Sequence, residues 1–165
     1  MKEAKFITQA AIIAALYVVL TFVANLFGLS SGAIQVRFSE ALTILPFFTP
    51  TAIPGLFLGC LLSNIICGGV IADIIFGSIA TLLGAIGTYA IRKKLPDWCA
   101  CIPPILANTL IVPFVLAYAY GVEDGIPYLM LTVGIGEVIS CGILGIILLK
   151  VLKGYKNQIF SRQTN

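Results

Sequence analysis

Glu137 is the residue of this sequence whose position most needs a chemical explanation. It lies ten residues after Pro127, in an apolar run that predicts a helix. At about 1.5 Å per residue it is roughly 15 Å along that helix, close to the middle of a bilayer. A charged side chain there costs about 2.5–3.5 kcal/mol on insertion scales, so it should face protein or water. The helical neighbours Gly134, Ser140 and Cys141 form a small, mildly polar face. We expect the Glu137 carboxyl to point into a cavity and bind a ligand, the alternative being a protonated, hydrogen-bonded structural role.

The densest polar cluster is Gln35-Val36-Arg37-Phe38-Ser39-Glu40, where a loop enters the second apolar segment. The spacing of three between Arg37 and Glu40 would place both on one helix face, where they could pair with each other or hold a ligand. The alternative is an ion pair at a helix end, which is worth little where it is exposed. Gln35, Arg37 and Glu40 are therefore candidate ligand-binding residues.

Asn64 and Asp73 add polar groups at the same depth as this cluster. The turn Cys67-Gly68-Gly69 separates them, and its glycines let the backbone approach closely. An amide and a carboxylate beside this turn could bind the same ligand as Arg37 and Glu40. The alternative for Asp73 is a cap on the positive end of the following helix.

Other polar residues are expected to have structural roles. Asn108 lies among several prolines, and we expect its side chain to bond a freed carbonyl or a neighbouring helix. The Cys99-x-Cys101 pair has few possible co-ligands for zinc, because the sequence contains no histidine. The cysteines are expected mostly as small buried side chains: Cys60, Cys67, Cys99, Cys101 and Cys141.

The sequence lacks the residues of common catalytic centres. It has no HExxH motif and no GxxxxGK(S/T) phosphate loop. Every lysine lies at the end of a predicted helix, which leaves Glu137 as the one acid at mid-depth. We predict that the chain is not an enzyme and holds no metal or cofactor. A mixture of carboxylates with amide and guanidinium donors suits an uncharged or cationic solute that is rich in hydrogen-bonding groups.

The composition predicts that lipid surrounds the chain. Of its 165 residues, 59% are hydrophobic and 10% are charged, and the mean hydropathy is +1.06. This is more apolar surface than one soluble core can hide. A span needs roughly 20 apolar residues, so six spans nearly use up the length. We expect an all-α membrane protein with one domain, residues 1–165, and no room for a nucleotide-binding domain.

Apolar runs predict a bundle of six transmembrane helices. The second and third are short, and Pro46, Pro50 and Pro54 interrupt the stretch that contains them. A re-entrant hairpin with four full spans is therefore an open alternative. The expected helices are Phe6–Phe27, Phe38–Phe48, Ala52–Cys67, Val70–Ile91, Ala100–Tyr120 and Tyr128–Val151.

Basic residues fix the predicted orientation. With six crossings, nine of the ten basic residues lie on one side, which is the cytoplasmic side by the positive-inside rule. Both termini are then cytoplasmic, and Arg37 is the one basic residue outside. The net charge of +3 follows this topology and gives no basic face for nucleic acid. The nine are Lys2, Lys5, Arg92, Lys93, Lys94, Lys150, Lys153, Lys156 and Arg162.

The first helix contains two overlapping pairs of small residues, Ala10 with Ala14 and Ala11 with Ala15. Small residues four apart let a second helix approach closely. The second helix belongs either to this chain or to a partner subunit.

Four segments resemble the QueT family of queuosine-precursor transporters, and the likeness spans essentially the whole chain. They are residues 34–43 (Ile-Gln-Val-Arg-Phe-Ser-Glu-Ala-Leu-Thr), 45–50 (Leu-Pro-Phe-Phe-Thr-Pro), 52–56 (Ala-Ile-Pro-Gly-Leu) and 59–64 (Gly-Cys-Leu-Leu-Ser-Asn). Members of this family are substrate-binding S components of energy-coupling factor (ECF) importers. The resemblance implies a six-helix S component in the cell membrane that binds its ligand near the outer face.

The resemblance also implies partners and a ligand. Ala10, Ala11, Ala14 and Ala15 would dock on a transmembrane coupling subunit, and a pair of ATPases would use the ATP. The S component would topple in the membrane to release its cargo. The ligand would be a deazaguanine base such as the aminomethyl precursor of queuosine, bound by Glu137, Glu40 and Asp73 with Asn64, Gln35 and Arg37. An aromatic residue would stack on the ring, with Phe38, Tyr118 and Tyr128 as candidates.

Two other functions fit the same residues. A standalone secondary transporter or channel would use Glu137 as a proton-coupled carboxylate. A membrane protein without transport activity would use the alanine face only for assembly.

Overall fold

The computed structural model describes residues 2–29 and 34–155, and every regular element in these ranges is helical. Three short stretches are not α-helix: η1 and η2 are 3-10 helices and η3 is a π-helix. The elements are α1 (Lys2–Leu26), η1 (Phe38–Phe47), α2 (Ala52–Ile66), α3 (Ile71–Ile91), η2 (Asp97–Cys101), α4 (Ile102–Tyr118), α5 (Ile126–Glu137), η3 (Val138–Gly145) and α6 (Ile146–Gly154).

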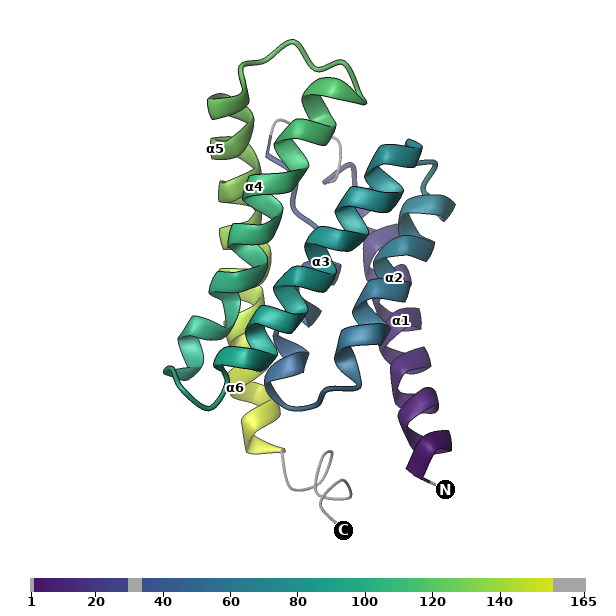
Figure 1. Ribbon diagram of the computed structural model, residues 1–165, viewed down its shortest axis with the longest axis vertical. Helices are drawn as coiled ribbons and strands as arrows, with labels where there is room; N and C mark the ends of the chain where they lie inside the picture. The colour runs from purple at the N-terminus through teal and green to yellow at the C-terminus, as the bar shows by residue number, and fades with distance from the viewer. Residues whose placement is uncertain (1, 30–33, 156–165) are drawn as a thin grey trace.

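These elements make six passes along one bundle (Figure 1). η2 runs directly into α4, and α5, η3 and α6 follow one another without a break. The start of α1 and the end of α6 lie at the same end of the bundle. The basic residues 92–94 follow α3 at this end, which we therefore call the cytoplasmic end. The opposite end is called the outer end.

Four of the passes are long and apolar enough to cross a membrane: Glu3–Leu26, Ile71–Ile91, Asp97–Tyr118 and Ile126–Gly154. Exposed large apolar side chains cover α1 and α3 to α6, as lipid requires. The chain is therefore an all-α, multi-pass membrane protein, as predicted. The predicted helix bounds are correct to within a few residues.

The second pass is a different type of helix from the one predicted. Phe38–Phe48 was expected as an α-helix, but η1 is a 3-10 helix, and extended backbone precedes it. Ten residues at about 2.0 Å each give roughly 20 Å, and residues 34–37 add about 13 Å when extended. Residues 34–47 together can therefore cross the bilayer. Residues 39–46 are buried, and non-helical backbone is tolerated at membrane depth under that condition.

Apolar and polar interior side chains occupy different parts of the bundle. The apolar core joins the beginning of α2 to η1 and α6 through Leu42, Ile44, Leu56 and Leu149. Glu40 and Glu137 are also buried, but they lie further from the cytoplasmic end along their elements. An apolar plug therefore lies on the cytoplasmic side of a polar interior.

The predicted docking face on α1 is split by contacts inside the chain. A Cβ on Gly55 would lie 2.8 Å from the Ala10 carbonyl, and a Cβ on Gly59 would lie 3.1 Å from the Ala14 Cα. This close approach of α2 buries Ala10 and Ala14, so their prediction as partner contacts is corrected. Ala11 and Ala15 are exposed on another face of the helix.

Candidate functional site

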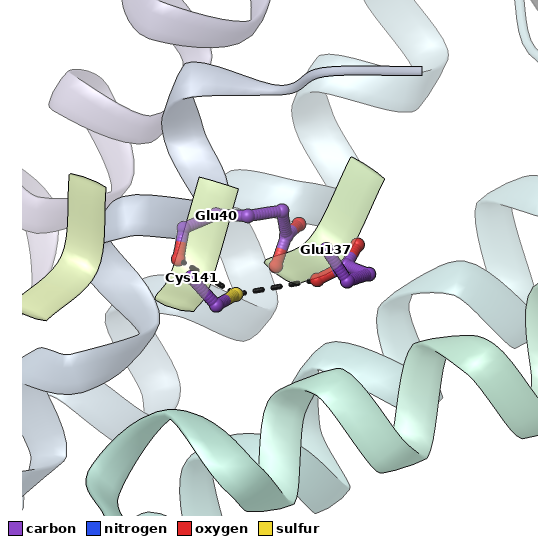
Figure 2. Close-up of side chains that lie close together, drawn as sticks. All are labelled: Glu40, Glu137 and Cys141. Carbon is purple, nitrogen blue, oxygen red and sulfur yellow. Dashed lines mark hydrogen bonds between the residues drawn. The ribbon is translucent and has the colours of Figure 1, made fainter. Parts of the chain in front are cut away.

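Two buried carboxyl groups meet inside the bundle. Glu40 is in the first turn of η1 and Glu137 is the last residue of α5, and their side chains are 2% and 8% exposed. Figure 2 shows the two carboxyl groups facing each other, with the Cys141 sulfur beside them. One carboxylate oxygen of each acid and the Cys141 sulfur all lie within 4.8 Å of one another. The prediction that Glu137 points to an interior polar site agrees with this geometry.

Hydrogen bonds hold Glu40 from three directions. The Tyr17 hydroxyl of α1 donates to Oε1, and Nδ2 of Asn108 in α4 donates to Oε2 at 3.4 Å. The Cys141 thiol lies 3.3 Å from the Glu40 carbonyl and 3.2 Å from Oε2 of Glu137. Helices α1 and α4 thus hold the Glu40 side chain, and the thiol of η3 contacts the backbone carbonyl of the same residue.

Segment η3 brings the two acids together. Its π-helical turns begin directly after Glu137, and such segments often lie at functional sites. The Arg37 backbone N–H donates to Oγ of Ser140 at 3.2 Å, so the extended chain before η1 is bound to η3. A Cβ at Gly136 would overlap the Gln35 carbonyl oxygen. Only glycine allows this approach, which sets the position of residues 34–37.

A narrow inner cavity of about 20 Å³ adjoins the acid pair. Gln35, Arg37, Glu40 and Glu137 line it. Cys60, Thr81 and Asn108 complete its polar wall. This volume holds about one water molecule.

A wider outer cavity of about 190 Å³ lies between the ends of α1, α2, α3 and α4. Its carboxylate is Asp73, which accepts a bond from the Tyr120 hydroxyl at 3.1 Å. Nδ2 of Asn64 donates to the Asp73 carbonyl at 3.2 Å. Asp73 also lies in the first turn of α3, where its charge favours the positive end of the helix, so the helix-end alternative stays open. Partial burial and then the Asp73 charge raise the pKa of Tyr120, which keeps its proton on the phenol.

The six predicted site residues therefore divide between two cavities. Gln35, Glu40 and Glu137 line the inner cavity, Asn64 and Asp73 line the outer one, and Arg37 lines both. Arg37 does not share a helix face with Glu40, because the helix begins only at Phe38. Their role in ligand binding stays a prediction.

Sequence reasoning missed several residues of the site. Asn108 is expected to bond a freed carbonyl or a neighbouring helix, and its amide does bond Glu40 of η1, but the sequence did not indicate that this bond makes it part of the site. Tyr17 and Tyr120 bear the hydroxyls that bond the acids, and a lone tyrosine in an apolar run gives no signal of direction. The predicted stacking residues Tyr118 and Tyr128 are 82% and 49% exposed and line neither cavity. Phe38 also lies outside both cavity walls.

Glu40, Glu137 and Cys141 together offer two carboxylates and a thiol to a cation. The same three groups could ligate a divalent metal, since zinc accepts sulfur and carboxylate ligands. They are equally suited to an ammonium group, which donates three hydrogen bonds. The arrangement favours a cation, and it suits a metal ion and an ammonium group alike.

An all-helical bundle with an apolar exterior and buried acids defines the class of multi-pass membrane proteins with an interior polar site. A family model described as "QueT transporter" matches residues 7–154. The chain belongs to the QueT transporter family.

One relative is the protein named queuosine precursor transporter QueT from Lactococcus lactis subsp. cremoris (strain MG1363). It is 40% identical over 85 residues, which cover 50% of this chain and 50% of that protein. The aligned part thus spans about half the length of the relative. No solved structure matches the chain.

The contact between Gly136 and Gln35 predicts the effect of adding one methyl group. Gly136→Ala should push residues 34–37 away from α5 and open the inner cavity. Alkylation of Cys60 by N-ethylmaleimide, followed by peptide mass spectrometry, should become at least about threefold faster, because a small loss of packing exposes the thiol. Gly134→Ala is the matched control, since its Cβ would meet only Thr109 at 3.5 Å. Equal rates in both variants contradict the contact.

Proposed function

We propose that this chain binds a queuosine precursor, a 7-deazaguanine base with an aminomethyl group, and delivers it inward as the S component of an ECF importer. Membership of the QueT transporter family and the name of the relative support the ligand class. The observation that carries the proposal is the convergence of Glu40, Glu137 and Asn108 on one buried point.

The chemistry of the base suits these groups. A guanine-like edge presents adjacent N–H donors, which one carboxylate accepts in a bidentate manner. The aminomethyl cation requires a second acceptor, and a second acid lies within reach. Arg37 and Gln35, in the wall of the inner cavity, can donate to the ring carbonyl and ring nitrogens.

Charge balance also favours a cationic ligand. The two cavity walls contain three carboxyl groups, from Glu40, Asp73 and Glu137, against the single guanidinium of Arg37. Buried carboxylates without a counter-charge are costly in a membrane. A bound ammonium group would offset this excess, whereas an anion would increase it.

Replacement of Glu137 tests the binding role directly. Glu137→Gln should weaken binding of 7-aminomethyl-7-deazaguanine at least about tenfold, since it removes a charge-assisted acceptor. Equilibrium titration of the purified protein by calorimetry measures this effect, and an unchanged melting temperature shows that the variant is folded. Glu123→Gln is the control, because Glu123 is exposed in the loop between α4 and α5. Unchanged affinity in Glu137→Gln removes Glu137 from the binding site.

The energy for transport is proposed to come from partner subunits. The sequence has no phosphate-binding loop of its own. Ala11 and Ala15 form a small exposed face on α1, where a helix of a coupling subunit can approach closely. A pair of ATPases beneath that subunit would then hydrolyse the ATP.

A larger side chain on this face should prevent assembly. Ala11→Leu is expected to lower co-purification with the coupling subunit and its ATPases at least about fivefold, because the helices can no longer approach. Binding of the deazaguanine should not change, since Ala11 lies far along α1 from Tyr17 and faces outward. Ala90→Leu is the control, because Ala90 is also exposed but lies on α3. Normal assembly of Ala11→Leu contradicts this docking face.

The paired acids give the second candidate function a specific basis. Two carboxyl groups this close can share and release a proton, as a proton-coupled secondary transporter requires. Uptake of radiolabelled 7-aminomethyl-7-deazaguanine into cells separates the two mechanisms. Under the proposed function, uptake should stop when ATP is depleted and should persist when the proton gradient alone is collapsed. The reverse result supports the secondary transporter.

A further inference from the structure

Arg37 is the residue that both cavities have in common. Its backbone N–H is bound to Ser140, so the main chain is fixed. Its side chain is only partly buried. Within residues 2–29 and 34–155, the structure gives its guanidinium no hydrogen-bond or ion-pair partner. The guanidinium interacts electrostatically with both Asp73 and Glu40, so it can turn from one acid toward the other without breaking a hydrogen bond.

Neither cavity alone combines room for a ring with the acid pair. The outer and inner cavities have volumes of about 190 Å³ and 20 Å³. The inner cavity has the acid pair but no room for a bicyclic ring. The outer cavity has more room but only one acid, Asp73. Joining the two spaces provides both.

The outer cavity is itself a built polar site. Asp73 is 5% exposed, and its carboxylate is oriented by the Tyr120 hydroxyl. Asn64 is 5% exposed, and its side chain fixes the backbone at Asp73. A Cβ on Gly77 would lie 3.1 Å from Oδ1 of Asp73, so glycine leaves that oxygen accessible. Two elements besides α3 thus hold this acid in place.

We propose that the outer cavity is a capture subsite for the cationic end of the ligand, and that Arg37 is a movable partition between this subsite and the acid pair. This inference rests on the proposed function. The ammonium group first binds the Asp73 carboxylate. The Arg37 side chain then turns toward the ring carbonyl of the ligand. The ring passes into the enlarged inner space, where Glu40 and Glu137 bind it.

Binding kinetics test the capture step. Asp73→Asn and Tyr120→Phe should each slow association of 7-aminomethyl-7-deazaguanine at least about fivefold, while the dissociation rate stays within about twofold, because capture contributes mainly to the on-rate. Stopped-flow fluorescence of the full chain in nanodiscs measures both rates. Asp124→Asn is the control, since Asp124 is an exposed loop acid. Unchanged association, or a loss of affinity caused by faster dissociation, overturns the inference.

Cys67 provides a second test that does not change an acid. It is partly exposed and lines the outer cavity, whereas the other four cysteines are buried. A bulky, membrane-impermeant methanethiosulfonate at Cys67 should slow association at least about tenfold, since it narrows the path of the ligand. Cys67→Ser treated with the same reagent is the control. An unchanged rate overturns the capture subsite, whereas failure of the untreated wild-type chain to bind overturns the proposed function itself.

Discussion

The burial of Glu40 beside Glu137 is the interaction on which the rest of this structure depends. Two carboxyl groups within 4.8 Å repel each other when both are charged, and lipid cannot solvate them. The surrounding elements supply what water would otherwise supply: a phenol from α1, an amide from α4 and a thiol from η3. What remains is a demand for a proton or another cation between the acids. The polar interior is therefore organised around positive charge, of which the chain itself supplies the Arg37 guanidinium.

The irregular backbone around the acids is what brings Glu40 and Glu137 close to each other. In a regular α-helix the side chains point outward at a fixed angular spacing of about 100° per residue. This spacing alone does not ensure that one chosen residue on each of two helices faces the other. Here η1 and the π-helical η3 deviate from α-helical spacing at the level of the two acids. Residues 35–37, which form no helix, pass over Gly136 to reach them. Such backbone is stable in a membrane only when it is enclosed by protein, and η1 is enclosed by α1, α2, α3 and η3.

The sequence was sufficient to predict the features that depend on composition and on the cost of burying charge. Hydropathy predicted the helices, and the cost of a mid-membrane acid pointed to Glu137. The orientation rests on the basic residues alone and stays a prediction. The sequence did not predict the geometry of close contacts between helices. The two alanine pairs of α1 differ by one residue, or about 100° around the helix, and only Gly55 and Gly59 on α2 decide that Ala10 and Ala14 face inward. The division into two cavities depends on the direction of a single arginine, which no spacing rule predicts.

The distribution of the interior side chains bears on how a solute could leave the site toward the cytoplasm. Leu42, Ile44, Leu56 and Leu149 are each at most 7% exposed, and they fill the space on the cytoplasmic side of the acids. A path through this plug would require the repacking of a dense apolar core, which is costly because such cores are not continuously deformable. Motion of the whole bundle leaves the core intact and instead changes which side of the membrane the outer cavity faces. The apolar exterior of the bundle is compatible with such a motion. The apolar plug thus fits the proposed S component, which would reorient as a body, and this mechanism stays a prediction.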